Sequence, residues 1–135
     1  MGSFFGRLRV IRLEGGYGWA LQQPLVFDSA IAGRLIIPAG FVTDFASVPR
    51  LPLVFLLAGD TAHEAAVVHD YLYRRAPLIG TPPRPITRAE ADAVFLEAMQ
   101  ATGIPAWRRR LMYAAVRAGG WRPWGQYRQA SPVPP

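Results

Sequence analysis

The residues most able to do chemistry lie in one short segment, His69-Asp70-Tyr71-Leu72-Tyr73, within a stretch that is otherwise apolar. On a helix, His69 and Tyr73 are four residues apart and share one face. An unpaired buried carboxylate is costly, so Asp70 needs a cation, an arginine or several N–H donors beside it. The segment therefore predicts a polar site on a buried helix.

A second carboxylate, Asp92, lies on the next predicted helix. It shares a stripe with Phe95 and Met99, three and seven residues further on, and that stripe should face the core. A carboxylate that reaches His69 from a second helix can fix the imidazole tautomer and stabilise the imidazolium that forms when the ring takes a proton. We predict a His69–Asp92 dyad from this spacing.

The segment PAGFVTDFASVP, residues 38–49, is rich in residues with special backbone or ligand properties. Asp44 and Ser47 could supply oxygen ligands, and the loop carbonyls could supply more. Together with Asp70 they would suit a hard cation such as Ca²⁺, which takes six to eight oxygen ligands. The other interpretation is that Asp44 and Ser47 cap a turn before Pro49.

The elements that must position these residues fall into two halves. Loosely alternating apolar residues predict a strand over residues 8–13, and further strands are predicted over residues 19–27 (broken at Pro24) and 34–37. Three helices are predicted in the second half, with a proline-rich loop between the first two, over residues 62–75, 87–102 and 105–120. The fold class is therefore α+β, with a small antiparallel sheet or meander packed on three C-terminal helices.

Local signals define the ends of these helices. Thr61 with Glu64, and Thr87 with Glu90, have the spacing of capping boxes. The third helix begins at a proline and ends at two glycines. Its apolar residues predict a core position for Trp107, Leu111 and Trp121.

The length of 135 residues suits one domain. We predict a single α+β domain over residues 1–122, with its β part at about 4–45 and its helical part at about 61–120. Residues 123–135 are predicted to form an extended tail that packs on the domain or binds a partner.

Composition excludes several classes of protein. The chain has no cysteine, which rules out disulfides and thiolate metal sites. Residues 51–58, the longest apolar run, are interrupted by Pro52 and too short to span a bilayer, and no secretory signal is present, so folding in a cytoplasm is expected. The net charge of +6 predicts attraction to polyanions or anionic surfaces. Because the only run, Arg108-Arg109-Arg110, is typical of a solvated helix face, nucleic acid is not the expected partner.

Three separated motifs, PAGFVTDFASVP, HDYLY and RAEADAVF, resemble the signature of a small family of unknown function that is common in phage and prophage genomes. The resemblance covers about residues 19–120. It implies a phage-associated origin, and with it a location in the host cytoplasm or in the virion. The expected partners are other phage structural proteins or a cell-envelope substrate.

The order of the polar residues is also similar to secreted phospholipase A2, especially its bacterial forms. The shared features are an Asp and Ser loop ending in proline, His-Asp-x-x-Tyr on a helix, and an aspartate three residues before a phenylalanine on the next helix. This resemblance implies that His69 activates the attacking water and that Asp92 orients His69. Asp70 would bind Ca²⁺ with help from Asp44, and Tyr73 would complete the hydrogen-bond network.

Two hypotheses of different classes follow. The first is a phage- or prophage-encoded hydrolase that acts on an ester or acyl bond through the His69–Asp92 dyad. The second is a non-catalytic structural or assembly component of a phage particle or tail. In the second, His69, Asp70 and Asp92 form a satisfied buried network that holds the helices together.

Overall fold

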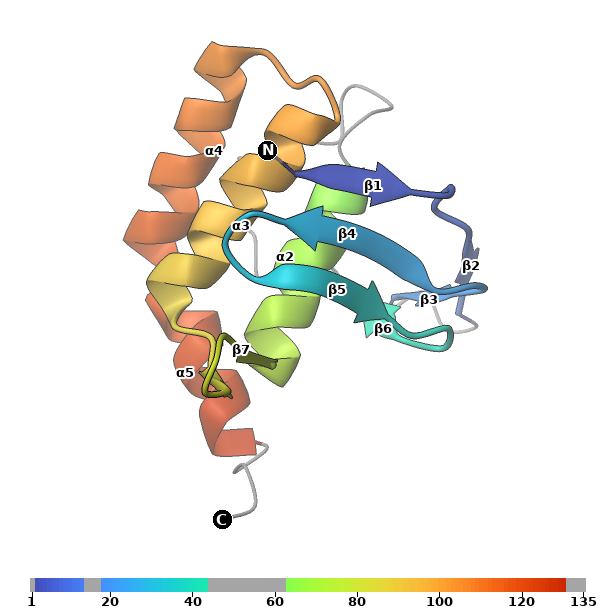
Figure 1. Ribbon diagram of the computed structural model, residues 1–135, viewed down its shortest axis with the longest axis horizontal. Coiled ribbons are helices and arrows are strands. Elements are labelled where there is room, and N and C mark those ends of the chain that lie inside the picture. The colour runs from blue at the N-terminus through green and yellow to red at the C-terminus, as the bar shows by residue number, and fades with distance from the viewer. Residues whose placement is uncertain (1, 14–17, 44–62, 131–135) are drawn as a thin grey trace.

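Short antiparallel strands come first in the chain and helices come second (Figure 1). The computed structural model describes residues 2–13, 18–43 and 63–130. The strands are β1 (Ser3–Phe5), β2 (Val10–Arg12), β3 (Trp19–Leu21), β4 (Leu25–Ser29), β5 (Gly33–Ile37), β6 (Val42–Thr43), β7 (Leu78–Ile79) and β8 (Arg84–Pro85). The helices are α2 (His63–Arg75), α3 (Arg88–Ala101), α4 (Ala106–Gly119) and α5 (Trp121–Ala130). The predicted α+β class is confirmed.

The longest strands, β4 and β5, form a hairpin that β1 extends, so the order in this sheet is β1-β4-β5. Buried side chains alternate with half-buried ones in β4 and with exposed ones in most of β5, as a sheet with one covered face requires. Opposed pairs on the buried face include Leu25 with Ile37 and Phe27 with Leu35. Helix α3 packs against this sheet through β1 and β4.

A specific polar contact joins this sheet to α3. The Ser29 hydroxyl donates to Glu97 Oε1 at 2.6 Å, and the Ala30 N–H donates to Glu97 Oε2 at 2.7 Å. The Ser29 oxygen in turn accepts from the N–H groups of Ile31 and Ala32, both at 3.0 Å. The turn between β4 and β5 is therefore anchored to the helix that carries Asp92.

A second small sheet, in the order β2-β3-β6, ends at Thr43. Thr43 is fully buried, and β6 lies against α2. This contact brings the end of the β part of the chain to the helix that carries His69 and Asp70.

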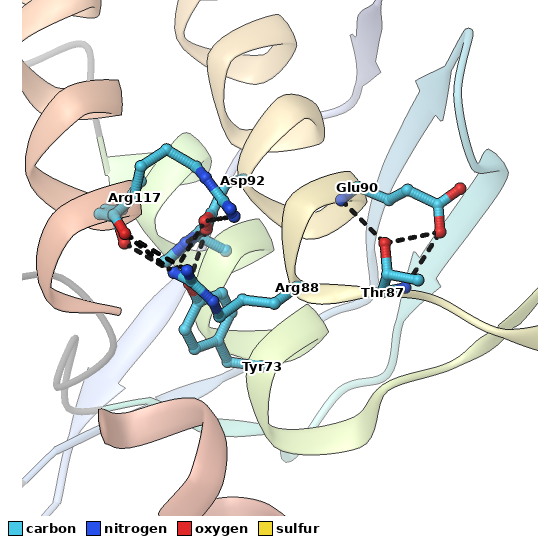
Figure 2. Close-up of polar contacts among 8 residues, drawn as sticks. Tyr73, Thr87, Arg88, Glu90, Asp92 and Arg117 are labelled. Carbon is cyan, nitrogen blue, oxygen red and sulfur yellow. Dashed lines mark hydrogen bonds and ion pairs between the residues drawn. The ribbon is translucent and has the colours of Figure 1, made fainter. Parts of the chain in front are cut away.

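Helix α2 is mostly buried, and α3, α5 and β6 pack against it, which explains its apolar sequence. Helix α3 packs against both α2 and α4, and α5 packs on α2 (Figure 1). The predicted capping box at the start of α3 is confirmed, because Thr87 accepts from the Glu90 N–H and Glu90 accepts from the Thr87 N–H (Figure 2). The other predicted capping box, Thr61 with Glu64, begins outside the described residues.

Two expectations are wrong for described residues. Residues 123–130 are helical rather than extended. Pro123 falls in the first turn of α5, where a helix tolerates proline. Trp124 and Tyr127, one turn apart, pack on the core. Trp107, Leu111 and Trp121 are exposed rather than in the core. Helix α4 has two apolar stripes, and it turns the other one, which contains Met112 and Val116, inward.

The remaining differences are small. The proline-rich loop after α2 contains the two-residue strands β7 and β8, and the sequence pattern did not indicate β1 or β6. No helix among residues 63–130 is long and apolar enough to cross a bilayer.

Candidate functional site

The packing of α2 against α3 brings His69 and Asp92 together. Nε2 of His69 lies 2.8 Å from Oδ1 of Asp92, and both side chains are fully buried. The inward direction predicted for Asp92 is therefore observed, since Phe95 and Met99 on the same stripe are buried as well. The imidazole ring packs against the Phe95 ring, with 4.5 Å between centroids.

Tyr73 joins the same carboxylate one turn after His69. Its hydroxyl donates to Asp92 Oδ1 at 2.6 Å, and its ring lies 4.2 Å from the imidazole, centroid to centroid. Burial of the phenol, followed by its hydrogen bond to the Asp92 carboxylate and the charge there, raises the pKa of Tyr73 well above its ordinary value. Tyr73 is thus a neutral donor that helps to hold the carboxylate in place.

Two arginines approach the other oxygen of Asp92 (Figure 2). Nη1 of Arg117, from α4, lies 2.9 Å from Oδ2, and Nη1 of Arg88, one turn earlier on α3, lies 3.4 Å from it. Arg88 also donates to the carbonyls of Val116 and Arg117 near the end of α4. Asp92 therefore joins α2, α3 and α4 through a single carboxylate.

The surroundings of Asp92 keep it ionised. Burial raises its pKa, but the hydrogen bonds from His69 and Tyr73, together with the Arg117 guanidinium, outweigh burial and hold the pKa below its ordinary value of 3.8. An ionised carboxylate can only accept hydrogen bonds, so Nε2 of His69 carries the hydrogen that lies between the two groups.

Asp70 is buried beside the end of β6. Its Oδ2 accepts a hydrogen bond from the Thr43 hydroxyl at 2.6 Å and another from Nε of Arg74 at 3.0 Å. The buried carboxylate thus has a guanidinium beside it, one of the partners expected from the sequence. Arg74 is four residues further along α2, which is a favourable spacing for an ion pair.

The described residues around Asp70 do not by themselves make a calcium site. One oxygen of Asp70 already faces the Arg74 cation, and no three His, Cys, Asp or Glu side chains gather into a metal-binding group within residues 2–13, 18–43 and 63–130. Ca²⁺ needs six to eight oxygens, more than this carboxylate and the Thr43 hydroxyl supply. Asp44 and Ser47 lie outside the described residues, so their part in a cation site stays a prediction.

Helix α5 covers the end of α2 next to the site. Arg128 donates to the backbone carbonyls of Tyr73 and Arg74, which lie in the last turn of α2. The Trp124 ring meets the Tyr73 ring edge-on, with 5.1 Å between centroids, and the Arg128 guanidinium stacks on Trp124. Burial lowers the pKa of Arg128. These contacts help to fix the position of Tyr73.

A glycine is required where α4 meets α5. A Cβ atom at Gly120 would collide with the Tyr73 hydroxyl oxygen and the Val116 carbonyl oxygen. Only a residue without a side chain allows the backbone to come so close to the hydrogen bond between Tyr73 and Asp92.

Sequence reasoning missed the cationic half of the site. Arg88 had a usable signal, since it precedes Asp92 by four residues on one helix. Arg117 and Arg128 had none, because they lie 25 and 55 residues from their partners Asp92 and Tyr73. Arginines on amphipathic helices are ordinarily solvent-facing.

Comparison with known proteins identifies the family but no activity. No curated protein and no solved structure matches the chain. One family model matches residues 19–116, a span that includes His69, Asp70, Tyr73 and Asp92 and ends before Arg117 and α5. The chain therefore belongs to DUF1353, a protein family of unknown function.

Proposed function

We propose that this protein is a hydrolase in which His69 acts as general base on an ester or acyl bond. The observation that carries the proposal is the buried contact of 2.8 Å between His69 Nε2 and the ionised Asp92. General bases work best when a second group fixes their tautomer and orientation. Asp92 has the position and charge for that role.

In the proposed mechanism, Nδ1 of His69 takes a proton from a water molecule as the water attacks the substrate carbonyl. Nε2 keeps its hydrogen on Asp92 Oδ1, and the carboxylate stabilises the imidazolium. Tyr73 donates to the same oxygen and keeps it aimed at the ring. The proton then passes from Nδ1 to the leaving group. No step uses a cation.

The class of substrate and the origin of the protein rest on resemblance. The contacts of His69 and Tyr73 with Asp92 Oδ1 support the roles that the similarity to phospholipase A2 implies for these residues. The three sequence motifs support a phage or prophage origin. We therefore propose acyl esters of the cell envelope as substrates, met either from the host cytoplasm or from a virion.

A specific observation favours a second candidate, a structural or assembly protein of a phage particle. Arg88 and Arg117 already balance the charge of Asp92, and the carboxylate links three helices. A network of this kind can specify a unique core without chemistry. In this candidate the same residues hold the helices in register.

The deciding experiment measures hydrolysis and stability on the same variants. The purified chain is assayed with p-nitrophenyl esters of increasing acyl length, with phospholipids and with O-acetylated peptidoglycan. We expect His69→Asn to lower kcat about 10²–10⁴-fold. The matched control is His63→Asn, the same substitution in the first turn of α2, which should keep full activity.

Two results would contradict the hydrolase. One is hydrolysis that survives His69→Asn unchanged. The other is a wild-type protein without activity on any of these esters, together with a large loss of stability in His69→Asn, which would establish the structural candidate instead.

A further inference from the structure

An apolar stripe on the outer face of α4 and the first residue of α5 is exposed to solvent. Large side chains lie at both ends of the stripe and small ones lie between, in the order Trp107, Leu111, Ala114, Ala118 and Trp121. Trp107, Leu111 and Trp121 are 62%, 46% and 65% exposed. A contiguous exposed apolar surface of this kind marks a surface for interaction.

The spacing within the stripe indicates what would cover it. The intervals are four, three, four and three residues, which is the 3.5-residue repeat of a seam between two helices. The repeat continues from α4 into α5 because Gly120 keeps helical backbone angles and donates to the Val116 carbonyl at 2.8 Å. The two alanines allow a second backbone to approach closely between the bulky ends. The complement of such a seam is another helix.

The positions beside the seam are basic. In the heptad that places Trp107 at d, four arginines fall at e or g positions, which set the choice of partner in paired helices. They are Arg108, Arg110, Arg117 and Arg122. Arg110 and Arg122 are exposed, Arg108 stacks on Trp107 with 5.5 Å to the ring centroid, and Arg117 reaches inward to Asp92. No Asp or Glu follows Glu97 in the sequence, so no acidic residue of α4 or α5 offsets this charge.

Charge selects among the occupants of this seam. A second copy would set arginine against arginine at the flanks of the seam, and like charges there oppose pairing. An anionic bilayer would be met by only three large apolar side chains, and the two alanines between them would add little to insertion. We propose that α4 binds an acidic amphipathic helix of another protein, whose apolar residues fill the seam and whose carboxylates face Arg110 and Arg122.

The test uses a synthetic probe in place of the partner. The probe is a 21-residue helical peptide with Leu at its a and d positions and Glu at its e and g positions, labelled with fluorescein. A second peptide carries Lys at the e and g positions. Fluorescence anisotropy with the full chain should show at least tenfold tighter binding of the Glu peptide, with affinity falling as salt rises.

Variants locate the site of binding. Replacing Trp107 and Leu111 with Ala should weaken binding of the Glu peptide at least tenfold. The matched control, which replaces the exposed Ile36 and Leu78 with Ala, should leave that binding unchanged. Changing Arg110 and Arg122 to Glu should reverse the preference, so that the Lys peptide binds better. The control Arg12→Glu, at an exposed arginine of β2, should leave the preference for the Glu peptide unchanged. Circular dichroism confirms that each variant is folded.

Three outcomes would overturn the proposal. Equal binding of both peptides by the wild type and the charge-reversed variant would mean that the arginines select nothing. A wild-type dimer in sedimentation that dissociates when Trp107 and Leu111 are replaced would assign the seam to a second copy. A blue shift of tryptophan emission on phosphatidylglycerol vesicles, with no peptide binding, would assign it to lipid.

Discussion

The substitution Asp92→Asn tests whether one ionised carboxylate holds three helices together. Asparagine has nearly the same shape, so its oxygen can still accept from Tyr73 and His69. Its NH₂ group, however, replaces Oδ2 and turns donors toward Arg117 and Arg88, which lie 2.9 and 3.4 Å from that oxygen. The variant therefore loses both ion pairs while the cavity stays filled.

The size of the loss follows from these contacts. A hydrogen bond to a charged group contributes about 1.5–3 kcal/mol, and the longer contact to Arg88 belongs at or below the lower limit. The arginine side chains are 34% and 20% exposed, so water recovers part of the cost. We expect a loss of about 3 kcal/mol, near the lower end of the range for removing one partner of a buried ion pair.

Thermal unfolding converts this free energy into a measurable shift. For 135 residues the entropy of unfolding is about 0.28 kcal/mol per kelvin, so Tm should fall by about 10 °C. Asp28→Asn is the matched control, because it breaks an exposed ion pair with Arg34 and should leave Tm nearly unchanged. If the two variants had the same Tm, or if Asp92→Asn were more stable than wild type, the argument that the Asp92 charge stabilises the helix packing would be refuted.

Three further expectations concern neighbouring features. The pKa of Asp92 in the folded protein is held below 3.8, so the contribution of the ionised carboxylate to stability is complete above about pH 4 and is lost as pH falls through that lowered pKa. The difference in Tm between wild type and Asp92→Asn should therefore narrow only below about pH 4. A difference that narrows between about pH 7 and 5 would contradict this. Thr87→Ala removes the N-cap of α3 and should cost about 1 kcal/mol in urea unfolding, whereas Thr87→Ser should restore the wild-type value. Gly120→Ala forces a methyl group onto the Tyr73 hydroxyl and should cost about 1–3 kcal/mol, while Gly125→Ala, which meets open space, should cost far less; equal urea midpoints would show that Tyr73 can move aside.

Local signals in the sequence were sufficient for much of the fold. The capping box at Thr87, the end of α3 before Gly103 and the end of α4 at Gly119 each depend on residues within one turn of the helix. Such signals act before any tertiary contact forms, so they can be read without a structure. The alternation in β4 and β5 is equally local.

The orientation of α4 could not be predicted in this way. Trp107 and Leu111 form an apolar stripe, and so do Met112 and Val116 on another side of the same helix. Periodicity shows that each stripe exists, but the choice of which one faces inward depends on the surface that α3 presents. The prediction that Trp107 and Leu111 lie in the core was wrong because, on this helix, the larger side chains are the exposed ones.

The candidate site likewise has one part that local sequence signals predict and one part that they do not. His69 and Tyr73 are four residues apart on one helix, and Asp92 lies on an inward stripe, so their meeting was predictable. Arg117 and Trp124 come from helices that follow later in the chain, and their positions depend on how α4 and α5 pack. Long-range cationic and aromatic contacts of this kind leave no pattern in a single sequence.

The two oxygens of Asp92 explain why the catalytic and the structural interpretations need not compete. Oδ1 faces α2 and receives the hydrogen bonds of His69 and Tyr73, whereas Oδ2 faces the guanidinium groups of Arg88 and Arg117. A group that orients a general base must itself be held still, and the ion pairs on Oδ2 restrain the carboxylate. The same charge balance limits how strongly Asp92 can stabilise an imidazolium. The contacts on Oδ2 therefore contribute to stability in both interpretations. Hydrolysis that requires His69, which lies on Oδ1, is the observation that distinguishes a hydrolase from a structural protein.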